Sequence, residues 1–166
     1  MKRFVVLVCT LALAAGLSPA RFADGAEGRL YLHFFKSQVC PHCRLAEREL
    51  PAVIKRYPRI TMVTYDVRNA MNQVDAVNRQ NLGTLIAMLQ QIHARNGGRP
   101  FIYEGNTPHA FVLVNGVPYY VKKLSDVTTI KKEVPIPVFI LGDRVYVGYQ
   151  ASTLNQAIAW FNTGKN

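Results

Sequence analysis

The stretch LYLHFFKSQVCPHC, which runs from Leu30 to Cys43, decides the fold. Its first part, Leu30 to Phe35, is apolar and aromatic, as is typical of a buried strand. The residues from Lys36 to Val39 predict a short loop. Cys40-Pro41-His42-Cys43 then opens a segment of helical periodicity that extends to about Tyr57. We therefore predict a strand, a loop and a helix, with two cysteines in the first turn of the helix.

The position of the cysteines points to thiol chemistry. A helix N-terminus presents free N–H groups and the positive end of the helix dipole, and both stabilise a thiolate at Cys40. Pro41 suits the first turn, where its missing N–H costs no hydrogen bond, and His42 can offer the same thiolate a hydrogen bond or a positive charge. A stable thiolate is a good leaving group, so the disulfide would be oxidising. Cys40 is the predicted nucleophile, and Cys43 the thiol that resolves a mixed disulfide.

Three other interpretations of the cysteine pair stay open. A structural disulfide here would close a tiny loop and add little stability. A structural zinc site needs four ligands, and the four histidines show no second paired spacing, which also weakens a copper site. The third alternative is a degenerate, inactive redox motif.

Strand and helix patterns follow along the chain. Ile60 to Val67 predicts a second strand. Residues 69–96 predict helices separated at Gly83, whose apolar stripe (Met71, Met88 and Leu89 among others) is expected in the core. Residues 111–121 form a hairpin pattern around Asn115-Gly116, a dipeptide that accepts the positive φ of a tight turn. Residues 138–149 form a second hairpin pattern, and Ser152-Thr153 would cap a closing helix.

The amino-terminal segment has the layout of a secretory signal. Lys2 and Arg3 precede an uncharged apolar run, Phe4 to Leu17, which is shorter than the roughly 20 residues of a membrane-spanning helix. We expect residues 1–20 to be a signal peptide, with cleavage after Ala20 or as late as Ala26. An uncleaved anchor is the alternative. Residues 21–28 would then be a flexible lead-in, and the protein would be periplasmic or secreted.

Composition excludes several classes of protein. The chain has 166 residues, of which 49% are hydrophobic, so it is neither a disordered chain nor two independent domains. Three cysteines are too few for a disulfide scaffold. Lys and Arg number 20 against 10 Asp and Glu, which suits anionic lipid headgroups, acidic partners or nucleic acid. Nucleic acid is disfavoured because the basic residues are scattered and export is expected. A solvated cationic surface without a dedicated partner is the alternative.

Phe34-Phe35 followed by Cys40-Pro41-His42-Cys43 resembles the active site of thioredoxin-fold enzymes. The Pro-His dipeptide is similar to that of the disulfide-forming DsbA branch, and the end of the chain is similar to that of glutaredoxins. The resemblance implies an α/β, thioredoxin-like fold for residues 29–166, with a central mixed sheet flanked by helices. It does not extend over about 68–133, where we expect a helical plus hairpin insertion beside the active site.

The resemblance also implies a cis-proline that faces the cysteines. Pro137 is the preferred candidate because a hairpin and a terminal helix follow it, and Pro108 is the rival. The family often has a buried acid six residues before the first cysteine, where this chain has Phe34. Strand alternation turns His33 to the opposite face, so proton transfer would rest on water or on His42. Glu47 and Glu49 are interpreted as part of a solvated helix face.

We therefore expect an exported thiol–disulfide oxidoreductase that exchanges disulfides with protein substrates. Cys40, Cys43 and His42 would be catalytic. Pro41, Ile136 and Pro137 would contact the substrate, with the Ile136 main chain pairing with an extended segment. The Cys40–Cys43 disulfide would be the redox group, with no organic cofactor and no metal.

The direction of exchange is expected to lean toward dithiol oxidation, because Ile136 is apolar where reductive members of the family often have threonine. A membrane partner would reoxidise or reduce the protein. The alternatives are a disulfide reductase or isomerase, and a non-catalytic metal-binding or assembly module on the same fold.

Overall fold

The computed structural model describes residues 28–97, 101–102, 110–114, 117–121, 130–131 and 136–164, with side chains in 28–97 and 136–164. The signal segment 1–20, nearly all of the lead-in, both expected cleavage sites and Pro108 lie outside the described residues.

A four-stranded mixed sheet forms the centre of the molecule, in the order β2-β1-β7-β8. Strands β1 (Leu30–Ser37) and β2 (Ile60–Arg68) are parallel. Strand β7 (Val138–Leu141) runs antiparallel to β1, and β8 (Arg144–Val147) runs antiparallel to β7. This α/β arrangement is compatible with the predicted thioredoxin-like fold.

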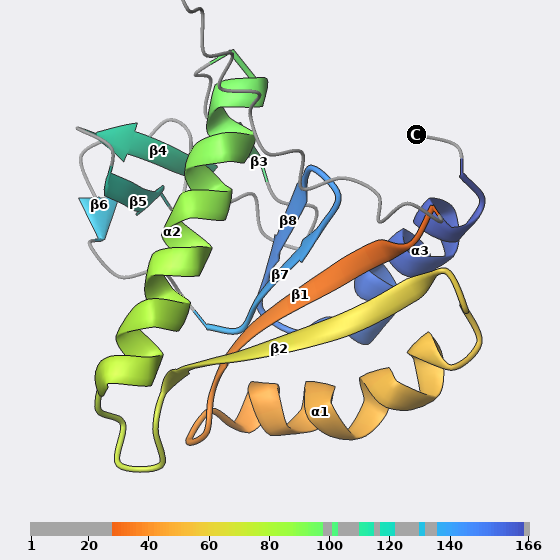
Figure 1. Ribbon diagram of the computed structural model, residues 1–166, viewed down its shortest axis with the longest axis horizontal. Helices are drawn as coiled ribbons and strands as arrows, with labels where there is room; N and C mark the ends of the chain where they lie inside the picture. The colour runs from red at the N-terminus through yellow and green to blue at the C-terminus, as the bar shows by residue number, and fades with distance from the viewer. Residues whose placement is uncertain are drawn as a thin grey trace, which may run out of the picture.

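Three helices cover the two faces of this sheet (Figure 1). Helices α1 (Pro41–Ile54) and α3 (Ala151–Asn162) pack on one face, and α2 (Ala76–Arg95) packs on the other. Alternation along β1 supplies both cores, since Phe34 faces α1 and α3 while Phe35 faces α2. Both phenylalanines are fully buried.

The segment before α2 differs from its prediction. The expected helical region began at residue 69 and was split at Gly83, whereas α2 begins at Ala76 and runs through Gly83 without a break. Two hydrogen bonds explain the late start, because the Asn69 side chain accepts from the backbone N–H groups of Met71 and Gln73 and holds a turn. Met71 is therefore 73% exposed and not in the core, while Met88 and Leu89 are buried as predicted.

A small antiparallel sheet lies between α2 and β7 in the sequence. Its strands are ordered β3-β4-β5-β6 and have the following bounds: Phe101–Ile102, Ala110–Val114, Val117–Val121 and Ile130–Lys131. The predicted pairing of 111–114 with 117–121 is confirmed. Pro118 pairs with Leu113 on one side, and β6 reaches only Tyr120 and Val121 on the other. Pro118 therefore stands where no ladder hydrogen bond is required of it.

The β7–β8 turn meets the end of α3. Gly142 has φ +60, and a Cβ at this position would lie 2.7 Å from Cε1 of Phe161, so both the turn and the packing require glycine. Helix α3 starts one residue earlier than predicted, after Gln150, and neither Ser152 nor Thr153 is its N-cap residue. Among the described residues no helix is both long and apolar enough to cross a bilayer.

Candidate functional site

Cys40 is the N-cap residue of α1, at the helix start that the sequence predicts, and lies three residues after the end of β1. Its backbone N–H donates to the Ser37 carbonyl at 3.1 Å, which holds the loop against the end of the strand. Its sulfur accepts a hydrogen bond from the Cys43 N–H at 3.3 Å. The thiol is half-buried and free. An N–H group and the positive end of α1 thus both act on the sulfur atom that is open to solvent.

Cys43 lies one turn later in α1 and has no exposed surface. Burial, followed by a hydrogen bond with Cys40, raises the pKa of the Cys43 thiol to about 12. A backbone hydrogen bond from Ser37 opposes that rise, whereas the charges of Cys40 and Glu47 add to it. The two thiols therefore differ in access, because Cys40 meets solvent and Cys43 is enclosed and protonated at neutral pH.

The Ile136–Pro137 peptide bond is cis. The Cys40 thiol donates a weak hydrogen bond to the Ile136 carbonyl, with 3.8 Å between sulfur and oxygen. The Pro137 carbonyl accepts from the Gly148 N–H at 2.8 Å, which fixes this segment to the end of β8. Two segments almost a hundred residues apart in the sequence thus meet at the Cys40 sulfur, and the cis peptide bond of Pro137 directly follows the carbonyl that it contacts.

Pro41 and His42 are exposed in the first turn of α1. Pro41 occupies the position where a helix tolerates proline best. The His42 side chain makes no hydrogen bond to any residue that the structure describes. The structure therefore does not bring His42 to the Cys40 sulfur, and its role stays a prediction.

A charged cluster lies beside the cysteines. The Lys36 ammonium contacts Glu47 of α1 at 2.6 Å and Asp66 of β2 at 2.9 Å. Only 9% of Lys36 is exposed. Burial opposes its charge, but hydrogen bonds and attraction to both carboxylates outweigh burial, so the pKa of Lys36 is raised. The cluster joins β1, β2 and α1, and its Glu47 also influences Cys43.

The sequence pattern does not predict this cluster. Lys36 was expected in a loop, whereas β1 continues to Ser37 and pairs Lys36 with Asp66 across the sheet. Glu47 was expected on a solvated helix face. The spacing offered one signal, because Glu47 follows Cys43 by four residues and therefore shares its side of the helix. Phe34, at the position of the family's acid, stacks on Phe139 with 4.6 Å between ring centroids.

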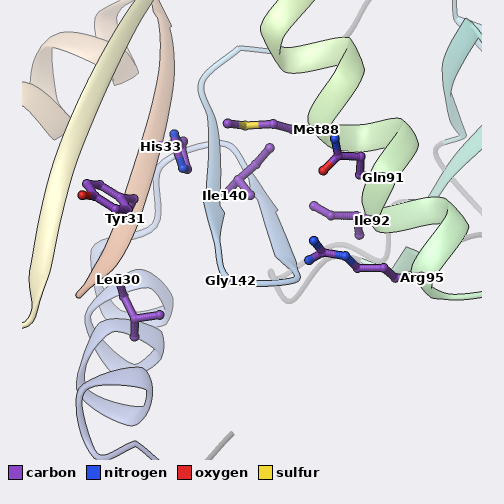
Figure 2. Close-up of a pocket in the computed structure, with 9 residues that line it drawn as sticks. All are labelled: Leu30, Tyr31, His33, Met88, Gln91, Ile92, Arg95, Ile140 and Gly142. Atoms are coloured by element: carbon purple, nitrogen blue, oxygen red, sulfur yellow. The ribbon is translucent and has the colours of Figure 1, made fainter. Parts of the chain in front are cut away.

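His33 faces away from the cysteines, as strand alternation predicts. Its Nδ1 lies 3.1 Å from the Tyr65 hydroxyl, and burial lowers the pKa of the imidazole. It lines a pocket at the opposite end of β1, between the sheet and α2, where Gln91 and Arg95 reach toward the sheet (Figure 2). The pocket is partly open to solvent and has about 30 Å³ of space for water-sized molecules, room for a water molecule or two.

Glu49 is the second acid of α1 and also has a partner. The Tyr149 hydroxyl donates to Glu49 Oε2 at 2.9 Å and ties α1 to the segment before α3. Burial, then this hydrogen bond and the charge of Glu49, raise the pKa of Tyr149 to about 12. Within the described ranges, no group of three or more His, Cys, Asp or Glu side chains is placed to hold a metal ion.

Together the fold and this geometry define an α/β protein with a dithiol at a helix start. Comparison of the chain with protein-family profiles, with curated proteins and with solved structures gave no match. The functional interpretation therefore depends on the residues and their geometry.

Proposed function

We propose that this protein is an exported thiol–disulfide oxidoreductase that oxidises dithiols in protein substrates, on a DsbA-like variant of the thioredoxin fold. The observation that carries the proposal is the position of Cys40. Its sulfur lies at the N-terminus of α1, 3.8 Å from the carbonyl oxygen that precedes cis-Pro137, with the buried Cys43 one turn behind it.

The exchange reaction follows from the unequal access of the two sulfurs. In the oxidised protein a substrate thiolate attacks Cys40 Sγ, which forms a mixed disulfide and breaks the Cys40–Cys43 bond. Cys43 leaves as a thiolate and takes up a proton, because its enclosed environment disfavours charge. A second substrate thiolate then attacks the substrate sulfur of the mixed disulfide and releases Cys40. Two electrons pass from the substrate to the protein, which a membrane partner would then reoxidise.

Glu47 is the group placed to handle the Cys43 proton. It is the carboxylate whose charge bears on Cys43, and Lys36 holds it in position. It stands in for the acid that the family carries on the strand and that Phe34 replaces here. His42 remains the candidate to stabilise the Cys40 thiolate from the solvent side.

The surface around Cys40 suits a protein segment. Val39 is 40% exposed directly before Cys40, and the Gln38 N–H donates to the Arg68 carbonyl at the start of the turn that holds Met71. An extended segment could pair with the Ile136 main chain and lay apolar side chains on Val39 and Met71, beside Pro41 and Pro137. The elements between β2 and β7 would be the insertion into the thioredoxin-like domain, and residues 1–20 would direct export and then be removed.

The reduction potential of the Cys40–Cys43 pair, measured by equilibration with glutathione, tests the proposal. A value near the roughly −120 mV of DsbA supports a dithiol oxidase, and one near the roughly −270 mV of thioredoxin indicates a reductase. Cys43→Ser should trap a mixed disulfide at Cys40, whereas Cys40→Ser should abolish exchange. Failure to form the disulfide at any glutathione ratio, or exchange that survives Cys40→Ser, would refute the assignment.

A further inference from the structure

Exposed basic side chains gather at the end of the central sheet opposite Cys40. Helix α1 ends there and strands β1 and β2 begin there, on the side of Figure 1 that also holds the end of α3. We name this surface the basic pole, and it consists of three exposed residues: Lys55, Arg56 and Arg59. Of the acidic residues that the structure describes, only Asp143 belongs to this end, because its turn follows the pairing of Leu141 with Leu32.

The charge of the basic pole is not cancelled locally. Lys55, Arg56 and Arg59 form no ion pair with any carboxylate in the described part of the chain. Arg59 donates instead to two neutral carbonyl groups, those of Gly28 at 3.2 Å and Asn162 at 3.3 Å. These bonds fix the direction of the guanidinium group without neutralising it, so the pole attracts anions.

An exposed tryptophan lies beside these cations. Trp160, in the last turn of α3, is 39% exposed, and the Arg144 guanidinium stands 4.4 Å from its ring centroid. The bond from Arg59 to Asn162 brings this turn to the basic pole. Tryptophan beside cations is typical of the boundary between water and lipid, where the ring meets headgroups and the cations meet phosphates.

The amino-terminal segment leaves the described structure at the same place. Gly28, the first described residue, is held by Arg59. The 27 residues before it include the apolar run from Phe4 to Leu17. A bilayer that receives this run, during export or as an anchor, is therefore joined to the described structure beside the basic pole.

We propose that the basic pole and Trp160 dock on an anionic phospholipid surface and leave Cys40 facing away from it. Strand β1 has eight residues, so about 23 Å separates its two ends, well beyond the roughly 8 Å Debye length at physiological salt. Cations near Cys40 would then contribute little to docking. This interaction does not depend on the proposed redox function.

The test uses the full chain and two kinds of vesicle, phosphatidylcholine alone and an equal mixture with phosphatidylglycerol. Trp160 is the single tryptophan of the chain, so its fluorescence reports the docked surface directly. We expect a blue shift and tighter partitioning with the anionic vesicles, and loss of that difference at about 1 M salt, where screening is nearly complete. Lys2, Arg3 and the apolar run are the same in every variant, so their contribution cancels when variants are compared on the same vesicles.

A pair of matched double variants locates the surface. Lys55→Gln with Arg56→Gln removes two exposed cations from the basic pole, and Arg44→Gln with Arg79→Gln removes two from the other end. Each cation close to an anionic bilayer is worth about fivefold in affinity, so the first variant should lose about thirtyfold. The second should lose less than twofold.

The second measurement tests the orientation of the bound protein on the vesicle. Cys40 of the vesicle-bound protein should react with a bulky, membrane-impermeant maleimide as fast as it does in the free protein. Equal losses in the two double variants would overturn the proposal, because binding would then follow net charge alone. So would an unchanged Trp160 spectrum with anionic vesicles, or protection of Cys40 on binding.

Discussion

The cationic side chains at the two ends of β1 differ in burial and in pairing. At the Ser37 end the Lys36 ammonium is buried and paired with two carboxylates beside the cysteines. At the Leu30 end the cations of the basic pole are exposed and without carboxylate partners in the described part of the chain. At the Ser37 end, charges therefore interact with partners a few ångströms away. At the Leu30 end, exposed charges interact with ions and surfaces over about a Debye length.

This difference suggests that charged side chains have different effects at the two ends of the sheet. Buried, paired charges set protonation and geometry at a reactive thiol, and salt screens them little. Exposed, unpaired cations contribute almost nothing to folding but give the molecule a side that prefers anions. Changes at the Ser37 end should therefore alter stability and thiol chemistry, whereas equivalent changes at the Leu30 end should leave both nearly unchanged.

Removing one lysine from each end gives the largest expected contrast. Lys36→Met should lower the free energy of unfolding by about 3 kcal/mol, because it leaves Glu47 and Asp66 facing each other without a cation. Lys55→Met removes the same group from an exposed position and should change stability by less than about 0.5 kcal/mol. Urea unfolding of the reduced variants at neutral pH measures both.

The same pair of variants can refute the difference between the two ends of β1. Equal unfolding midpoints for Lys36→Met and Lys55→Met would mean that the Lys36 contacts contribute nothing to the folded state. The triple change of Lys36→Met with Glu47→Gln and Asp66→Asn should recover part of the lost stability, since it removes the unpaired charges as well.

The secondary structure was predictable from the sequence, but the buried charges at the Ser37 end were not. The strand, the helix that begins at Cys40, both hairpin pairings and the closing helix followed from periodicity and turn chemistry. The Lys36 cluster did not, because a lysine after an aromatic run marks a loop more often than a buried ion pair. The late start of α2 depended on the Asn69 side chain, whose local hydrogen bonds overrode the apolar repeat.

The pH dependence of stability tests the enclosed state of Cys43. Its pKa is about 12 in the folded protein and roughly 8.5 in an unfolded chain, so the folded state retains the proton that the unfolded state loses. The stabilisation is complete below pH 8.5 and declines as pH rises from there toward 12. By pH 10 the reduced protein should lose about 2 kcal/mol.

Two controls isolate this loss. Cys43→Ser keeps Cys40 but cannot titrate at residue 43, so its unfolding free energy should lack the extra decline between pH 8.5 and 10. The oxidised wild-type protein should lack it too. A reduced wild-type protein whose decline matches that of Cys43→Ser would show that Cys43 ionises as freely in the folded state as in water. Lys36 and Tyr149 are present in both the wild-type protein and Cys43→Ser, so the effects of their raised pKa values cancel in this comparison.

The smallest expected effect compares two tyrosine hydroxyls from the two ends. Tyr149→Phe deletes the hydrogen bond to Glu49 and should cost about 1 kcal/mol of unfolding free energy. Tyr31→Phe removes the same atom near the Leu30 end, where the hydroxyl has no hydrogen-bond partner among the described residues, and should cost almost nothing.

Because the Tyr149 bond ties α1 to the segment after Pro137 and β8, its loss should also loosen the approach of Ile136 to Cys40. The rate at which the mixed disulfide forms should then fall in Tyr149→Phe and not in Tyr31→Phe. Equal rates in the two variants would show that the Tyr149–Glu49 hydrogen bond stabilises the fold without positioning Ile136 beside Cys40.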